Sequence, residues 1–207
     1  LRDQNDSAEE NFVSEQTAAW YAALYQKDGL RGGHVILLNG ADSPCYEATR
    51  KQAEEALRAY PGGLQLGGGV SPENAEDWLD AGASHVIVTS YVFRNGQIQY
   101  DNLEKMRNTV GKEHLVLDLS CRKKDGDYYV VTDRWQKFTD VQVTPALLTE
   151  LSAACSEFLI HAVDVEGKAS GIEKDLVRML GDWEGIPVTY AGGVGSMGDL
   201  ELLKELG

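Results

Sequence analysis

The chain has 207 residues, of which 43% are hydrophobic and 25% charged, so it can fold around a sizeable core and is not intrinsically disordered. Its 19 Lys and Arg against 33 Asp and Glu give a net charge of −14, which opposes binding to nucleic acid or to an anionic membrane. Three cysteines, far apart in sequence, favour neither a disulfide framework nor a thiolate zinc site. No apolar run reaches membrane-spanning length, and we expect a cytoplasmic monomer.

Strands and helices alternate along most of the chain. Residues 1–11 are polar and predict a loop, and the helix that follows has an apolar face formed by Ala18, Tyr21, Ala22 and Tyr25. Six short apolar runs come next, and they begin at His34, Leu64, His85, Leu115, Phe158 and Val188. Helix-like stretches such as 47–59 and 73–81 separate most of the runs. Near-continuous apolar strands alternating with helices predict a parallel sheet covered by helices.

The longest interval between runs lies between those that start at Leu115 and Phe158. It contains a turn signal at Asp125-Gly126, and excursions this long are usually functional loops. A plain surface hairpin is the alternative. Trp135 lies within this excursion, and it is predicted either to fill a small core under the loop or to act as an aromatic lid that stacks on a planar heterocycle.

A short glycine motif occurs twice. Gly68-Gly69-Val70 recurs as Gly192-Gly193-Val194 at an offset of 192 − 68 = 124 residues, and each copy leads into a helix. A strand follows the first copy, whereas the second copy stops at Gly207, and residue 1 already lies in the loop before the first helix. Six visible strands plus one at each end give the eight of a (β/α)₈ TIM barrel. We therefore expect residues 1–207 to form a single barrel domain, truncated at both ends, without strands 1 and 8. An open six-stranded sheet is the alternative, but it exposes strand edges.

Anion-binding positions are predicted where these strands end, because the working residues of such barrels lie at the carboxyl ends of their strands. Gly68-Gly69 ends one strand and Thr89-Ser90 ends the next, so backbone amides and hydroxyls can form a phosphate cup. Gly192-Gly193 repeats the glycine half of this cup. The expected ligand is a small molecule with two phosphates at opposite ends.

The strand from Leu115 contains a carboxylate. A period of two places Asp118 on the face toward the barrel mouth, together with Ser120 and Arg122. A carboxylate inside a strand is costly unless it is paired or used. Asp118 is therefore predicted to be a general acid or base, with a structural salt bridge to Arg122 as the alternative.

The strand from Phe158 carries His161 and Asp164, which alternation places on opposite faces. Asp164 lies near the end of the strand, so we expect it at the site, whereas a lone histidine such as His161 is more often structural. The sequence has no group of His, Cys and carboxylates with metal-ligand spacing, so we expect no metal.

Five segments, LQLGGG, VIVTSYVF, VLDLSCRK, FLIHAVDVEG and YAGGV, occur in this order. Together they resemble the eukaryotic-type ProFAR isomerases of histidine biosynthesis (phosphoribosylformimino-aminoimidazole carboxamide ribotide isomerases), and the resemblance runs through essentially the whole chain. It implies a half-barrel-duplicated (β/α)₈ enzyme without metal or cofactor. That family converts an aminoaldose to an aminoketose by an Amadori rearrangement. One carboxyl group opens the ribose ring by protonating its oxygen, and a second removes the C2 proton.

The resemblance implies that Asp118 is one of these carboxyl groups, usually the acid. The other lies on the family's first strand in an Asp-Leu-x-x-Gly context, which this sequence does not contain. The bacterial form has its fifth-strand Asp two residues later, where Ser120 stands here, and an acid could serve from either position. The sixth-strand Thr of that form is unmatched, since Ala162 or Val163 stands there, which makes Asp164 the expected polar contact. The predicted substrate-binding residues are Gly68, Gly69, Thr89, Ser90, Ser120, Arg122, Trp135, Asp164, Gly192 and Gly193.

Two other interpretations stay open. The chain could be another phosphosugar barrel enzyme, such as the cyclase subunit of imidazole glycerol phosphate synthase or phosphoribosylanthranilate isomerase. It could also be a non-catalytic phosphosugar-binding barrel. The run Cys121-Arg122-Lys123 after Asp118 favours the resemblance to the isomerase.

Overall fold

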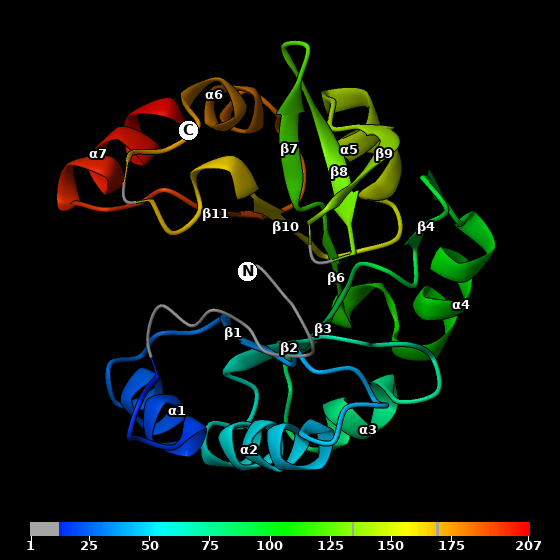
Figure 1. Ribbon diagram of the computed structural model, residues 1–207, viewed down its shortest axis with the longest axis vertical. Coiled ribbons are helices and arrows are strands. Elements are labelled where there is room, and N and C mark those ends of the chain that lie inside the picture. The colour runs from blue at the N-terminus through cyan, green and yellow to red at the C-terminus, as the bar shows by residue number, and fades with distance from the viewer. Residues whose placement is uncertain (1–12, 134, 169) are drawn as a thin grey trace.

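The computed structural model describes residues 13–133, 135–168 and 170–207, and these form an α/β fold around a six-stranded parallel sheet (Figure 1). The strands of the sheet are β1 (Gly33–Ile36), β2 (Leu64–Gly67), β3 (His85–Val88), β6 (Leu115–Asp118), β10 (Glu157–His161) and β11 (Val188–Ala191). They lie in chain order across the sheet, and every neighbouring pair is parallel. All six apolar runs are thus confirmed as strands. The loop predicted for 1–11 lies outside the described residues.

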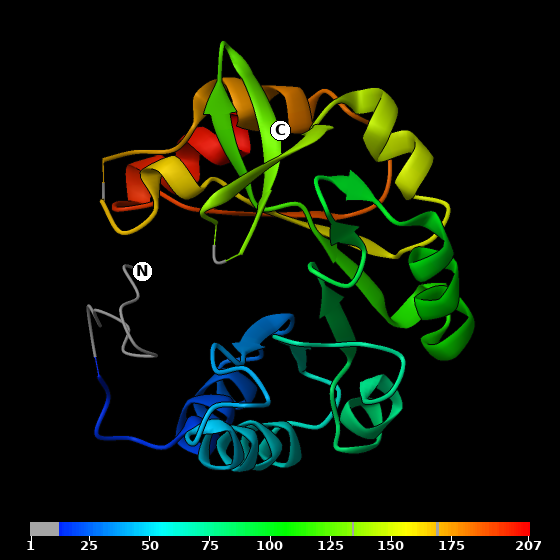
Figure 2. The same ribbon diagram turned by 45° about the vertical axis from the view of Figure 1, so that its right-hand side comes forward.

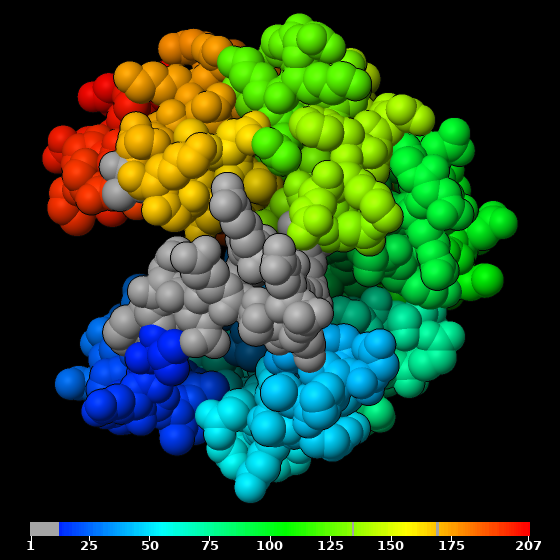
Figure 3. Space-filling model, in the orientation of Figure 1, coloured from blue at the N-terminus to red at the C-terminus, as the bar shows by residue number. Residues whose placement is uncertain are grey.

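Seven helices in the described part of the chain lie outside the curled sheet (Figures 1 and 2). They are α1 (Ala18–Lys27), α2 (Tyr46–Ala59), α3 (Ala75–Asp80), α4 (Tyr100–Val110), α5 (Pro145–Leu151), α6 (Lys174–Gly181) and α7 (Met197–Leu206). The predicted stretches 47–59 and 73–81 are confirmed as α2 and α3. The space-filling view shows the segments coloured blue to cyan and those coloured orange to red on opposite sides of the molecule (Figure 3).

The strand period of two sorts the side chains of β6 between the two faces of the sheet. Leu115 and Leu117 join the main core that also contains the buried side chains of the helices. Val116 packs instead with Ile87 and Leu159 in a small separate cluster on the other face. The alternation predicted for this strand is therefore confirmed. Each fully buried leucine contributes about 1.5–3 kcal/mol to folding by leaving water.

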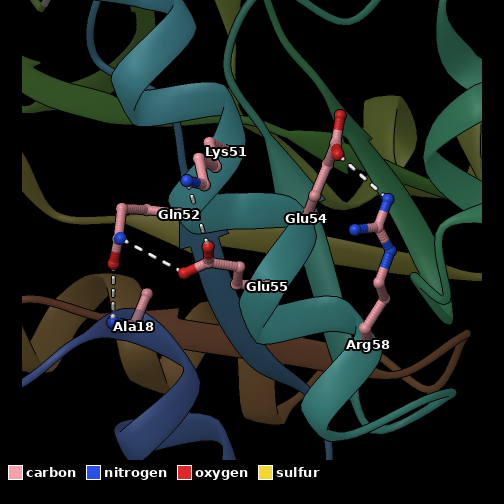
Figure 4. A network of polar contacts seen from close by, with 6 residues as sticks. All are labelled: Ala18, Lys51, Gln52, Glu54, Glu55 and Arg58. Carbon is pink, nitrogen blue, oxygen red and sulfur yellow. Dashed lines mark hydrogen bonds and ion pairs between the residues drawn. The ribbon is translucent and has the colours of Figure 1, made fainter.

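Helices α1 and α2 are joined by a polar network (Figure 4). The backbone N–H of Ala18, the first residue of α1, donates to Gln52 of α2 at 3.1 Å, so a group that the helix itself leaves without a partner is satisfied. Gln52 in turn donates to Glu55 at 3.3 Å. On the same helix Glu54 pairs with Arg58 at 3.0 Å, one turn away. Exposed pairs at this spacing contribute about 0.3–0.5 kcal/mol each.

The long excursion forms a three-stranded antiparallel sheet of β7 (Cys121–Lys124), β8 (Asp127–Thr132) and β9 (Lys137–Gln142). Asp125 and Gly126, with φ angles of 54° and 99°, connect β7 to β8, and two positive φ angles are typical of tight hairpin turns. The predicted turn is confirmed. The excursion is more than a plain hairpin, because its third strand, β9, pairs with β8. A second small hairpin, of β4 (Phe93–Arg94) and β5 (Gln97–Ile98), lies before α4.

The parallel sheet curls but does not close on itself within the described residues, where β1 and β11 are its outer strands. The predicted parallel α/β architecture is confirmed to this extent. Two short 3₁₀ helices adjoin the sheet: η1 (Lys112–His114) precedes β6, and η2 (Val163–Val165) follows β10. None of the helices that the structure describes is long and apolar enough to cross a bilayer.

Candidate active site

A pocket of about 200 Å³ lies at the carboxyl ends of β1, β2, β3 and β6. The end of β8 and the loop between β8 and β9 contribute the rest of its lining, so the excursion reaches over this edge of the sheet. Six of the predicted site residues line the pocket: Gly68, Gly69, Thr89, Ser90, Asp118 and Trp135. A neighbouring pocket of about 470 Å³ shares Gly69 and Ser90 with it and adds Arg94 and Lys137. The smaller pocket is the better candidate for the active site, because Asp118 lines it.

Asp118 is the last residue of β6, and its carboxylate is held by three hydrogen bonds. The hydroxyl of Thr89 donates to Oδ2 at 2.9 Å. The backbone N–H and the hydroxyl of Ser120 donate to Oδ1 at 2.7 and 2.6 Å. These bonds fix the orientation of a half-buried carboxylate at the wall of the pocket. Such a group can accept a proton directly, whereas it must first be protonated to act as an acid.

Arg122 pairs with Asp164 rather than with Asp118. Its Nε lies 2.8 Å from Oδ1 of Asp164, and Oδ2 of the same carboxylate accepts the backbone N–H of Lys123 at 2.8 Å. The salt bridge between Asp118 and Arg122, considered as an alternative, is therefore not the pairing that the structure shows. Asp164 ties the beginning of β7 to η2.

His161 is the last residue of β10 and has only 12% of its side chain exposed. Its Nε2 lies 3.0 Å from the carboxylate of Glu166, and its ring lies 4.8 Å from the Trp135 indole at an interplanar angle of 86°. Alternation along the strand does not extend to Asp164, because β10 ends at His161 and Asp164 lies in a 3₁₀ turn to which a period of two does not apply. One feature of the sequence could have indicated that His161 lies near this edge of the sheet: His161 ends an apolar run, on the same face as Leu159.

The two glycine pairs have nearly the same backbone geometry. The φ angles are 101° and 66° at Gly68 and Gly69, and 114° and 78° at Gly192 and Gly193. A Cβ at Gly68 would lie 2.1 Å from the carbonyl oxygen of Leu37, and the equivalent atom at Gly192 would lie 2.6 Å from a backbone carbonyl oxygen, that of Ala162. Each of these carbonyls belongs to the first residue after the preceding strand. The repeat in the sequence is thus also a repeat in backbone geometry, and only glycine fits at its first position.

The remaining predicted residues, Ser120, Arg122, Asp164, Gly192 and Gly193, are not among those that line this pocket. Ser120 donates hydrogen bonds to Asp118, whereas Arg122 and Asp164 pair with each other. Gly192-Gly193 follows β11, two strands away from β6 in the sheet. The structure thus brings one glycine pair to the carboxylate and places the other pair farther along the same edge.

Burial changes the acidity of groups close to the site. It raises the pKa of the Cys121 thiol to about 12, and the negative charges of Asp118 and Asp164 add to this shift. Cys121 is therefore a protonated, unreactive thiol at neutral pH. Burial also lowers the pKa of His34 on β1, and the nearby carboxylates of Glu157 and Asp118 offset this only in part. Within the described ranges, no group of three or more His, Cys, Asp or Glu could hold a metal ion.

Comparison with known proteins places the chain in a family. The family model described as "Histidine biosynthesis protein" matches residues 2–207. A chloroplastic imidazole-4-carboxamide isomerase of Medicago truncatula is 55% identical over 197 residues, which cover 95% of this chain and 62% of the relative. Isomerases of the same name from Yarrowia lipolytica and Saccharomyces cerevisiae are 44% and 40% identical, with 100% and 98% of this chain and 78% and 77% of the relatives covered.

These matches run through every strand of the sheet and through the residues that form the pocket. The chain spans less than two thirds of the length of the Medicago relative and about three quarters of the two yeast relatives. The matched residues include those of the pocket and both glycine pairs. The chain belongs to the histidine biosynthesis protein family.

Proposed function

We propose that the protein is an aldose–ketose isomerase that performs an Amadori rearrangement of the bis-phosphorylated histidine-biosynthesis intermediate ProFAR to its phosphoribulosyl isomer. One observation carries this proposal: Asp118 is held by three hydrogen bonds in a pocket between a glycine turn and an indole. Similarity to relatives named as imidazole-4-carboxamide isomerases, at 40–55% identity, supports it.

In this mechanism Asp118 is the proton-transfer group supplied by β6. A carboxyl group protonates the ring oxygen of the aminoaldose, and the ring opens to a Schiff base. Removal of the C2 proton by a second carboxylate gives the enolamine, which becomes the ketose. Protons only move between positions of the substrate, so neither a metal nor a cofactor is needed. Thr89 and Ser120 hold the Asp118 carboxylate in place during these transfers.

Two anion sites would hold the ends of the substrate. The first would use Gly68-Gly69 with Thr89-Ser90, and the second Gly192-Gly193. Backbone amides suit this role in a chain of net charge −14, because they bind phosphate without requiring a basic surface. Arg122 and Trp135 would contact the middle of the substrate, the first through hydrogen bonds and the second by stacking on its heterocycle. Asp164 would act there through Arg122.

We also propose that the six parallel strands belong to a half-barrel-duplicated (β/α)₈ barrel, with residues 1–207 in a single domain. Support comes from the curl of the sheet, from its sequential strand order and from the matched geometry of the two glycine pairs. Such a protein would act as a cytoplasmic monomer on a small molecule, and neither nucleic acid nor membrane would take part.

The test is an assay of the purified full-length protein, because residues 1–207 do not contain the Asp-Leu-x-x-Gly segment that would supply the second carboxylate. Three phosphosugar substrates are compared: ProFAR, its phosphoribulosyl isomer with ammonia, and phosphoribosylanthranilate. The proposal expects isomerisation of ProFAR and no cyclase product. Exclusive turnover of phosphoribosylanthranilate would show that the chain is a different barrel isomerase. Tight binding of ProFAR without any turnover would favour the non-catalytic phosphosugar-binding alternative.

A further inference from the structure

The loop between β8 and β9 holds Trp135 in an uncommon backbone conformation. Its φ angle is 66°, in the left-handed region that bulky side chains rarely adopt. A residue stays in such a conformation only when its surroundings hold it there, and this kind of strain occurs often at ligand sites. The indole lines the pocket that contains Asp118. The contacts that hold the indole therefore bear directly on the site.

The structure places the ring of His161 against the indole. The two rings meet edge to face, with centroids 4.8 Å apart and planes at 86°. His161 is itself held, because its Nε2 lies 3.0 Å from Glu166 and only 12% of its side chain is exposed. The imidazole thus connects a carboxylate after β10 to an indole that lies 26 residues earlier in the chain (161 − 135 = 26).

We propose that His161 and Glu166 are positioning residues for Trp135. Glu166 fixes the proton on Nε2 and the plane of the imidazole, and the imidazole fixes the plane of the indole. Trp135 would then already have its binding orientation in the free protein, so that its side chain loses less conformational freedom when the ligand binds. The part of the proposal that concerns a planar ligand rests on the proposed function, whereas the positioning itself does not.

Fluorine NMR of the protein labelled with 5-fluorotryptophan tests the positioning without any assay of activity. The chain has four tryptophans, and the Trp135 resonance is the one that disappears in Trp135→Phe. We expect His161→Ala to shift and broaden this resonance and to leave the others in place. His161→Phe keeps an aromatic ring and should restore much of the original shift. Glu166→Gln should produce a smaller shift in the same direction as His161→Ala.

Glu54→Gln is the matched control, because Glu54 is also an ion-pair carboxylate but lies on the outer helix α2. It pairs with Arg50 and with Arg58, and the second pair is drawn in Figure 4. It should leave all four resonances unchanged. If His161→Ala did not fold, Glu166→Gln would decide, since it changes a half-exposed side chain. A Trp135 resonance that neither His161→Ala nor Glu166→Gln moves would overturn the proposal, and so would one that Glu54→Gln moves equally.

A kinetic measurement then connects the positioning to the ligand. Loss of an edge-to-face pair corresponds to about 2- to 10-fold in an equilibrium constant, so His161→Ala should raise the KM for ProFAR by about that factor and change kcat far less. In the Trp135→Ala background the same substitution should have little further effect. Additive effects on KM would contradict the coupling. A protein with the expected fluorine shifts but no isomerase activity would refute the proposed function alone.

Discussion

Substituting alanine for either glycine of the first pair should reveal how closely two strand ends approach each other. Gly68 and Gly69 both have positive φ angles, so either alanine pays about 1–2 kcal/mol of backbone strain. Only at Gly68 would the new Cβ also collide with backbone atoms, at 2.1 Å from the oxygen and 2.7 Å from the nitrogen of Leu37. At Gly69 no atom lies within 4 Å of the added carbon.

The collision at Gly68 must displace the end of β1. The hydrogen bond from the Leu37 N–H to the Gly67 carbonyl, 2.9 Å long, would then be strained or lost at a cost of about 1 kcal/mol. We expect Gly68→Ala to lower the free energy of unfolding by about 2–4 kcal/mol and Gly69→Ala by about 1–2 kcal/mol. Urea unfolding of the two variants and the parent measures both values. Equal losses would refute the close approach as the reason for glycine at position 68.

Three further predictions concern groups around the sheet. Because burial lowers the pKa of His34, its protonation favours the unfolded chain. The free energy of unfolding should therefore decrease as the pH falls from about 6.5. Urea titrations at several pH values measure this dependence, which His34→Asn should flatten. Iodoacetamide at pH 7.5 should alkylate exposed Cys45 in the native protein but not Cys121, with its pKa of about 12, which intact-mass spectrometry can count. Asp164→Asn should weaken the hold on Arg122 and raise the KM for ProFAR by about 10-fold with a smaller change in kcat, and an unchanged KM would show that this ion pair does not affect the site.

The strands of the sheet were predictable from sequence because each reads as a short apolar run. This holds even for the outer strands β1 and β11, which are only partly buried. The alternation in β6 also placed Asp118 correctly, since a period of two holds as long as the strand continues. The repeated glycines pointed to a real backbone repeat, because the φ angles and the close carbonyl contacts at Gly68 and Gly192 demand glycine whatever the neighbouring residues are.

The bond from Thr89 to Asp118 and the ion pair of Arg122 with Asp164 were not predictable, because they join segments that are distant in sequence. Arg122 lies closer in sequence to Asp118 than to Asp164, yet the course of the chain through η2 brings Asp164 to it. The partnership of His161 with Trp135 depends on where the loop between β8 and β9 comes to lie, and periodicity within one strand carries no information about that. Short-range patterns therefore predicted the strands and the position of Asp118, whereas tertiary packing determines which side chains from distant segments pair at the site.

The central claim is that Asp118 transfers a proton in the proposed isomerisation, and turnover of ProFAR by Asp118→Asn in the full-length protein tests it most directly. The amide keeps the size of the side chain and can still accept the bonds from Ser120, so the variant should fold. Positioned acid–base groups contribute about 10²- to 10⁴-fold to the rate, and we expect kcat to fall by that factor with KM almost unchanged. Asp182→Asn, at an exposed carboxylate after α6, is the matched control and should retain full activity. A folded Asp118→Asn variant that turned over ProFAR within a few-fold of the parent rate would contradict the account.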